Sequence, residues 1–153
     1  MDKEYLSKEK YEELGRELDY LRRQKRKEVA ERLESARSLG DLSENAEYHS
    51  ARDEQAETEA RIEQLKDLLK RAEIIKHVNK DSAEIGSTVT LQKKGEKDKV
   101  EYTIVGSEES DLSAGKISYQ SPLGAAILGK KKKDEFSFET PKGVVEYVVV
   151  DIK

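Results

Sequence analysis

The sequence contains no cysteine and no tryptophan, and only two of its 153 residues are proline. Without cysteine the chain has no disulfide framework, no thiolate metal site and no cysteine nucleophile, so its stability has to come from packing. No stretch approaches the roughly 20 apolar residues of a membrane span, and the N-terminus has no apolar run of the signal-peptide type. We therefore expect a soluble, cytoplasmic protein without a membrane partner.

A strong net charge is also missing, although charged residues are abundant. They make up 41% of the chain, but 29 Lys and Arg nearly balance 33 Asp and Glu, which leaves a net charge of -4. This balance disfavours nonspecific coating of nucleic acid. Only 35% of the residues are hydrophobic, too few for one compact globule with a deep core. We therefore expect an elongated part.

The first half of the chain is nearly free of helix breakers, because both prolines and seven of the nine glycines lie beyond it. Apolar residues recur at helical spacing over Ser7–Leu39, with Ser7 as N-cap, and over Glu44–Ile75. Each segment would be roughly 50 Å long, and only a partner helix can bury such a stripe. The short connection Gly40–Ser43 makes the two helices antiparallel neighbours. The expected seam of the second helix, polar in the middle, is Tyr48, Ala51, Gln55, Thr58, Ile62, Leu65, Leu69 and Ala72.

Beyond Glu84 the pattern changes to the alternation of β-strands. A short helix is expected over 121–129, between a proline start and a glycine stop. The fold class is therefore α+β, with a long antiparallel coiled-coil hairpin over 1–76, a linker over 77–83 and a small C-terminal domain over 84–153. The expected strands of that domain are Ser87–Gln92, Lys99–Val105, Glu135–Glu139 and Val144–Ile152.

Several carboxylates gather at the predicted tip of the hairpin, Asp41 and Glu44 among them. One interpretation is structural: Asp41 or Ser43 caps the second helix and the acids favour its dipole. The other is chemical and compatible with the first. Two carboxylates cannot complete the six-oxygen shell of Mg²⁺, but they could contribute to a metal that another protein already holds. Asp41 would be the metal ligand, Glu44 would position or deprotonate a water, and Ser43 would help by hydrogen bonding.

The segment GDLSENAEYHSARDEQ, residues 40–55, resembles the signature of the bacterial GreA family of transcript cleavage factors. GKISYQSPLGAAILGK at 115–130 and the closing stretch TPKGVVEYVV extend the resemblance over the chain. It implies a C-terminal domain of FKBP-like topology and a DNA-binding transcription protein. It further implies that the hairpin enters the secondary channel of a backtracked RNA polymerase and lends its tip to the polymerase active site.

The resemblance also implies roles for individual residues. The factor would have no cofactor of its own and would act on Mg²⁺ in the polymerase active site, so it would not itself be an enzyme. Its partners would be bacterial RNA polymerase and the 3′ end of the nascent RNA, and it would act as a monomer. The implied tip residues are Asp41, Ser43 and Glu44. Near the tip, the residues implied to bind RNA or polymerase are Arg37 and Arg52. The residues implied to grip the channel mouth are Ser121, Pro122 and Leu123.

Other interpretations of the same sequence stay open. Arg37 and Arg52 could lie on a solvated helix face, and 121–123 could be ordinary turn and core chemistry. The basic run Arg22–Lys27 is either a solvated face or a contact with RNA or acidic channel walls, and Lys130–Lys133 receives no role. The competing functions are a channel-binding inhibitor of the same fold, a peptidyl-prolyl isomerase or chaperone, and a structural coiled-coil adaptor. Two Phe and no Trp are few aromatics for an isomerase pocket.

Overall fold

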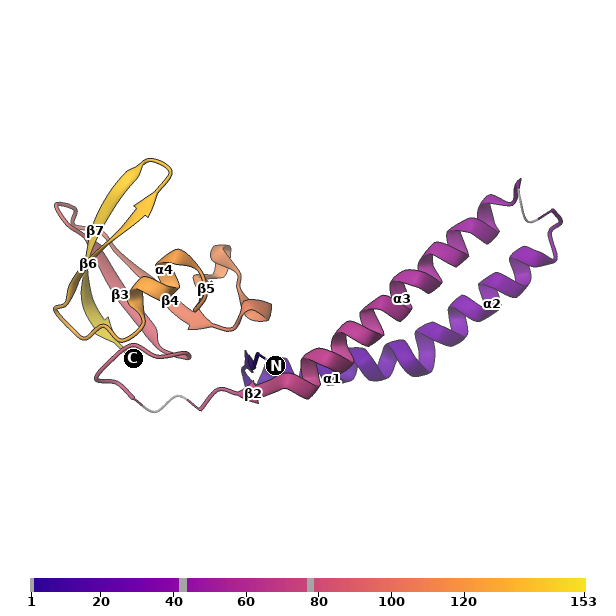
Figure 1. Ribbon diagram of the computed structural model, residues 1–153, viewed down its shortest axis with the longest axis horizontal. Helices are drawn as coiled ribbons and strands as arrows, with labels where there is room; N and C mark the ends of the chain where they lie inside the picture. Colours follow the sequence, from indigo (N-terminus) through magenta and orange to yellow (C-terminus); the bar gives the residue numbers. More distant parts are fainter. Residues whose placement is uncertain (1, 42–43, 77–78) are drawn as a thin grey trace. The chain divides into compact units, whose positions relative to one another are not determined.

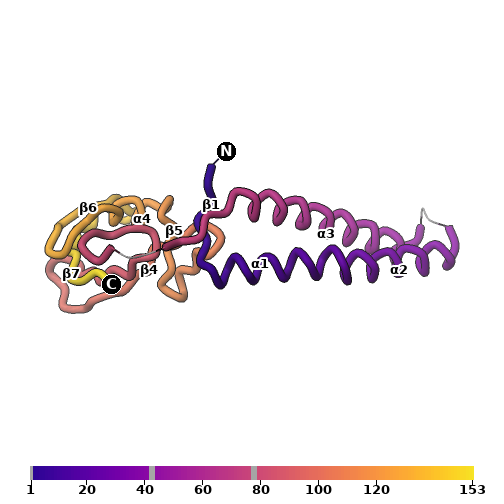
Figure 2. Tube along the Cα trace, turned by 90° about the horizontal axis from the view of Figure 1, so that it is seen from below, coloured from indigo at the N-terminus to yellow at the C-terminus, as the bar shows by residue number. Residues whose placement is uncertain are grey.

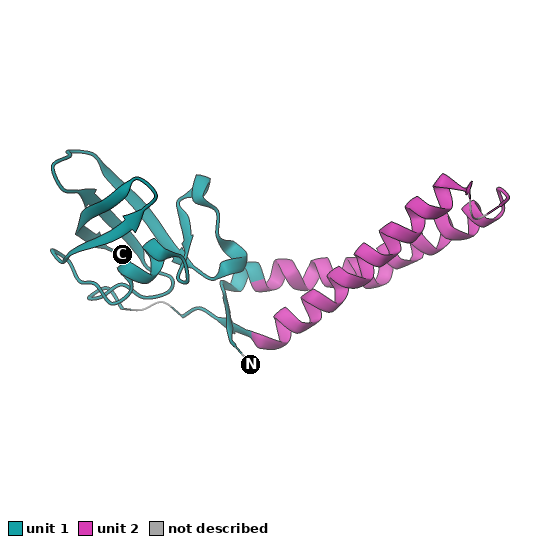
Figure 3. Ribbon diagram, turned by 45° about the horizontal axis from the view of Figure 1, so that its top comes forward, with its two compact units in different colours: residues 1–10, 72–153 teal, residues 11–71 magenta. Residues whose placement is uncertain are grey.

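The structure is a computed structural model that describes residues 2–41, 44–76 and 79–153 (Figure 1). It divides into two compact units, which Figure 3 shows in different colours. One unit comprises residues 11–71, and the other comprises residues 1–10 together with 72–153. Among the described helices, none is both long and apolar enough to cross a membrane.

The predicted helical hairpin is confirmed. Its first arm consists of α1 (Lys8–Tyr20), a π-helical turn η1 (Leu21–Lys25) and α2 (Arg26–Arg37). Its second arm is α3 (Ala46–Arg71), which returns antiparallel beside α2 (Figure 2). Ser7 caps the first arm as expected, since its Oγ accepts a hydrogen bond of 3.1 Å from the Lys10 N–H.

The two arms bury an apolar stripe with a polar interruption. Thr58 is only 6% exposed, and its hydroxyl donates to the Glu54 carbonyl of its own helix at 2.7 Å. The spacing places Leu69 in the stripe, but the structure buries Leu68 and leaves Leu69 half-buried, because a straight helix drifts against a strict heptad. The buried residues are Leu14, Val29, Leu33, Ala36, Ala51, Thr58, Ile62, Leu65 and Leu68.

The base of the hairpin corrects the predicted end of the second helix. Instead of continuing to Ile75, α3 stops at Arg71 and the chain forms β2 (Ala72–Ile74). This strand pairs in parallel with β1 (Glu4–Leu6), and the Ile75 N–H donates to the Leu6 carbonyl at 2.8 Å. The pairing provides hydrogen-bond partners for the backbone of β1. A helix over 72–74 would use its N–H and C=O groups within itself and could not provide them.

The segment that carries β1 also contacts a loop far along the chain within the same unit. The Ser7 N–H and hydroxyl both donate to the Glu109 carboxylate, at 2.6 and 3.0 Å. The Tyr5 ring meets Tyr119 edge to face, with 5.4 Å between centroids. These contacts explain why residues 1–10 group with 72–153.

A five-stranded sheet dominates the C-terminal part of the chain, in the order β5-β4-β3-β7-β6. All neighbours are antiparallel except β4 and β5, which run parallel. The four predicted strands are confirmed, whereas β5, only three residues long, was not predicted. The strands are β3 (Thr88–Lys93), β4 (Lys99–Val105), β5 (Lys116–Ser118), β6 (Glu135–Thr140) and β7 (Gly143–Ile152).

The predicted short helix is α4 (Pro122–Ile127), and it packs on the core of this sheet. Its Ile127 is fully buried in the same cluster as residues of β3, β4 and β7. Gly124 allows the close approach of α4 to β5, because a Cβ there would lie 2.0 Å from the Ser118 carbonyl oxygen. At Gly15 in α1, by contrast, there is room for a side chain, because a Cβ added there would have no atom within 4 Å.

These two glycines predict opposite effects of the same substitution. Gly124→Ala should lower the free energy of unfolding of the C-terminal part by roughly 2 kcal/mol or more, because backbone atoms have to move. Gly15→Ala should raise that of the hairpin by about 0.5–1 kcal/mol, since alanine is the better helix former. Urea unfolding followed by circular dichroism measures both. Wild-type stability of Gly124→Ala would contradict the packing described.

Candidate functional site

The tip of the hairpin carries both predicted acids on the surface. The structure places Asp41 and Glu44 between the end of α2 at Arg37 and the start of α3 at Ala46, and both are exposed. Gly40 takes a φ of +130°, a conformation that favours glycine and turns the chain away from α2. Ser43, predicted to assist the acids, lies outside the described residues.

Asn45 closes the tip. Its Oδ1 accepts a hydrogen bond from the Tyr48 N–H at 3.1 Å, and its Nδ2 donates to the Ala36 carbonyl at 2.5 Å. The first bond is that of a helix N-cap, so Asn45 caps α3 and the expectation for Asp41 is corrected. The same expectation for Ser43 concerns a residue outside the described ranges. Asn is among the best capping residues, but Asp and Ser share this preference, so the preference alone could not select Asn45 from the sequence.

The two predicted basic residues lie on opposite arms, and both are exposed. Arg37 ends α2 and places its guanidinium carbon 6.0 Å from the ring centroid of Tyr48 on α3, a cation–π contact across the hairpin. Tyr48 itself packs against the buried cluster near the tip. Arg52 donates to the Gln55 side chain at 3.1 Å within its own helix. Arg37 and Arg52 therefore present positive charge on the parts of the two arms that lead to the tip.

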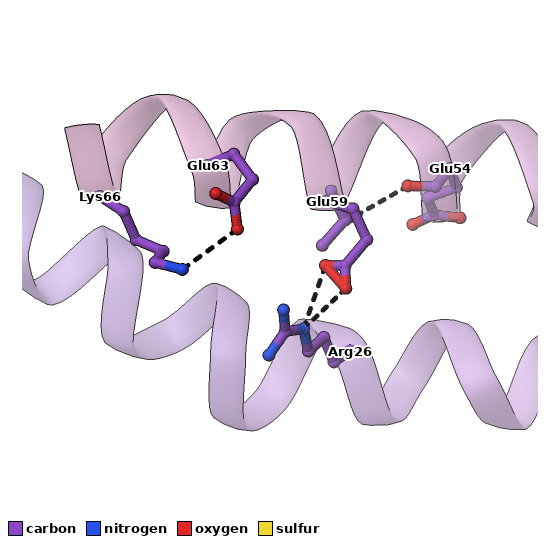
Figure 4. Close-up of polar contacts among 6 residues, drawn as sticks. Arg26, Glu54, Glu59, Glu63 and Lys66 are labelled. Atoms are coloured by element: carbon purple, nitrogen blue, oxygen red, sulfur yellow. Dashed lines mark hydrogen bonds and ion pairs between the residues drawn. The ribbon is translucent and has the colours of Figure 1, made fainter. Parts of the chain in front are cut away.

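Ion pairs between the arms flank the buried stripe. Arg26 on α2 holds both carboxylate oxygens of Glu59 on α3, at 3.0 and 3.1 Å (Figure 4). Nearer the base, Arg61 grips Glu17 in a bidentate pair at 2.8 and 3.0 Å. Each cross-arm pair resists sliding of one helix along the other.

A single carboxylate on α3, Glu54, pairs with two cations of the first arm, Lys25 and Arg32. Its side chain is only 24% exposed. Within the basic run Arg22–Lys27, Arg23 pairs with Asp19, Lys25 with Glu54 and Arg26 with Glu59, so much of the run is engaged within the hairpin. The compensating acids lie largely on the opposite arm.

The residues predicted to grip a partner from the C-terminal part differ in what they can offer. The Ser121 hydroxyl is engaged within the fold, accepting from the Gly124 N–H at 3.0 Å and donating to the Ser118 carbonyl at 2.7 Å. Leu123 packs against the core of the sheet. Pro122, the first residue of α4, is exposed. The three residues are thus neighbours, with Pro122 exposed and Ser121 and Leu123 half-buried.

The run Lys130–Lys133 forms the turn between α4 and β6. The Lys131 N–H donates to the Asp134 carboxylate at 2.8 Å, and Lys133 has a φ of +73°. Lys132 lies 2.9 Å from the Asp151 carboxylate, and this hydrogen bond lowers the pKa of Asp151. Part of the run is therefore explained by the turn it builds.

No group of three or more His, Cys, Asp or Glu side chains in the described ranges, 2–41, 44–76 and 79–153, is placed to hold a metal ion. At the tip, Asp41 and Glu44 offer hard oxygen ligands of the kind that Mg²⁺ prefers. Two carboxylates supply only part of an octahedral shell. What they can do chemically is to complete a metal site or to orient a water beside one.

Two family models match the chain, one to each half. The first, described as "Transcription elongation factor, N-terminal", matches residues 4–74, and the second, "Transcription elongation factor, GreA/GreB, C-term", matches residues 78–153. The sequence is 44% identical to the transcription elongation factor GreA of Roseiflexus sp. strain RS-1, over 97% of this chain and 96% of that protein. It is 45% identical to the GreA of Thermoanaerobacter pseudethanolicus, with the same coverage. A solved structure, that of GreA factor homolog 1 of Thermus thermophilus, is 31% identical, covers 99% of both chains and aligns with a TM-score of 0.45.

The double pairing of Glu54 predicts a measurable contribution to the hairpin. Glu54→Gln should lower its free energy of unfolding by about 1 kcal/mol, because two cations lose their charged partner. The difference should shrink in about 1 M NaCl, where the screening length falls to roughly 3 Å. Glu57→Gln, at an exposed position three residues further along α3, is the matched control and should change stability by less than about 0.5 kcal/mol. Equal effects of the two variants would refute the role of the pairs.

Proposed function

Because the chain belongs to the GreA/GreB family of transcription elongation factors, we propose that it stimulates a bacterial RNA polymerase to cleave nascent RNA that has backtracked. The hairpin enters the secondary channel of the polymerase and carries its tip to the active site, where the 3′ end of the RNA lies. Arrested complexes are thereby rescued. The observation that supports this most directly is the placement of two exposed carboxylates, Asp41 and Glu44, at the turn between two long paired helices.

The hairpin has the reach that such a delivery needs. The 26 residues of α3 span about 39 Å at 1.5 Å per residue. Along this length the arms are held by the buried stripe and by the pairs of Glu54, Glu59 and Arg61. A rigid pair of helices can deliver a tip to a buried centre where a flexible loop of equal length would pay an entropic penalty.

At the polymerase active site the two acids take different roles. Asp41 offers an oxygen ligand to Mg²⁺ that the polymerase holds, and Glu44 orients or deprotonates the attacking water. Ser43 supports them by hydrogen bonding. When bound, Mg²⁺ lowers the pKa of a coordinated water and stabilises the negative charge that develops on the phosphodiester. Arg37 and Arg52, on either side of the tip, provide positive charge for RNA or for acidic channel walls.

The cleavage chemistry belongs to the polymerase and not to this chain. Two carboxylates lack the remaining ligands of an octahedral Mg²⁺ site, so the factor assists a centre built by its partner and needs no cofactor of its own. The factor acts as a monomer and, like the transcription it serves, in the cytoplasm. Its DNA contact is indirect, through the elongation complex.

The C-terminal part serves as the second contact with the polymerase. We assign it an FKBP-like topology on the basis of its largely antiparallel sheet and the helix α4 packed on the sheet core. The surface around Ser121, Pro122 and Leu123 grips the mouth of the channel, with Pro122 exposed for contact. A fold of this type does not by itself confer isomerase activity, since function resides in a site.

Cleavage of labelled RNA in a stalled, backtracked polymerase complex tests the proposal. Asp41→Ala and Glu44→Ala should each abolish stimulated cleavage while polymerase binding stays within about threefold of wild type, because the lost contacts act on the transition state. Glu47→Ala, which removes an exposed carboxylate from the first turn of α3, is the matched control and should cleave normally.

Two outcomes would contradict this function. If binding fell in parallel with cleavage, the acids would be part of the docking surface. If the wild-type protein suppressed the intrinsic cleavage of the polymerase, the chain would be an inhibitor that occupies the same channel.

A further inference from the structure

We propose that Asn45 is a positioning residue that holds Asp41 and Glu44 in the geometry needed for cleavage, an inference that rests on the proposed function. Asn45 is half-buried between the ends of the two arms and touches both of them. Its two hydrogen bonds join the last turn of α2 to the first turn of α3. Both acids lie in the segment that this junction encloses.

The bond to α2 closes the tip at its base. The Nδ2 of Asn45 donates to the carbonyl of Ala36, nine residues earlier, at 2.5 Å. Ala36 is buried, and its carbonyl also accepts from the Leu39 N–H at 3.1 Å. The bond ties Asn45, which is next to Glu44 and four residues after Asp41, to the last turn of α2. A tie at this place reduces the conformations open to both acids.

Asparagine suits this position because the two bonds make opposite demands. One atom of the side chain has to accept from the Tyr48 N–H, and another has to donate to the Ala36 carbonyl. The amide carries an acceptor and a donor side by side. Aspartate can still cap α3, but it has an acceptor where the amide donates to the Ala36 carbonyl, so that bond is lost. Serine can also cap α3, but its side chain is too short to donate to Ala36 at the same time.

Placement of the acids matters because they act on a centre that another protein holds. Displacement of a reacting group by about 1 Å can cost on the order of 100-fold in rate even when binding is intact. A loosened tip would still enter the channel but would bring the carboxylates to the metal less often in the productive geometry. Asn45 therefore acts through Asp41 and Glu44, without touching the substrate.

The test compares Asn45→Asp and Asn45→Ser with the wild type. Both variants retain a good helix cap, so the thermal unfolding of the hairpin should stay close to that of the wild type. Ala46→Asp is the matched control, since it adds the same charge at the next, exposed position and leaves both Asn45 bonds in place. Any effect of added charge alone will appear in this control.

Two measurements are made on each variant. Backbone ¹⁵N relaxation of the free protein reports the order of Asp41 and Glu44, and RNA cleavage over a range of factor concentrations separates the maximal rate from the half-saturating concentration. We expect lower order at both acids and a maximal rate reduced about tenfold or more in both Asn45 variants. The half-saturating concentration should stay within about threefold of wild type. Ala46→Asp should match the wild type in both measurements.

The outcomes separate this inference from the function on which it rests. A wild-type protein that does not stimulate cleavage refutes the proposed function, and the inference falls with it. An active wild type with equally active Asn45 variants, or with unchanged order at Asp41 and Glu44, refutes the inference alone. If saturating factor restores the full rate, Asn45 contributes to docking and not to positioning.

Discussion

The narrow seam between the two helical arms is the constraint on which the hairpin depends. Each arm buries one stripe of apolar side chains, and Thr58 interrupts it with a hydroxyl that is satisfied within its own helix. On either side of Thr58, where the stripe has less apolar contact, ion pairs at the edges of the seam also hold the arms together. Glu54 and Glu59 there bind cations of the opposite arm. The register set by seam and flanks fixes which residues meet at the turn, and so where Asp41 and Glu44 lie.

Hydrophobic periodicity predicts the elements that bury a continuous face. Both arms and four of the five strands of the large sheet follow from spacing of this kind, whereas α4 follows from the proline and the glycine that bound it. Periodicity fails where pairing is decided by distant partners. The segment Ala72–Ile74 has the pattern of a helix end but becomes a strand because it pairs with β1, which is about 70 residues earlier in the sequence. The strand β5 is too short to show a period and forms by adding to the edge of β4.

In the candidate site, too, features set by neighbouring residues could be predicted from the sequence, and features set by distant residues could not. Asp41 and Glu44 could be found from the sequence because acids gathered at a predicted turn are unusual. Asn45 was missed, because its importance depends on two facts that emerge only in three dimensions. The helix α3 begins at Ala46, later than the apolar spacing indicates, and the carbonyl of Ala36 is within reach of the Asn45 amide. Capping preference alone could not choose among Asp41, Ser43 and Asn45.

The π-helical turn at Leu21–Lys25 has a consequence for the phase of the first arm. Leu14 and Leu21 are seven positions apart, as are Val29 and Ala36, but Leu21 and Val29 are eight apart. In an uninterrupted α-helix that extra residue would rotate the distal stripe by about 100° around the axis and away from α3. The wider turn absorbs it, so both stripes face the same partner. The first arm thus accommodates the equivalent of a one-residue insertion, and α3 carries no compensating π turn along its length.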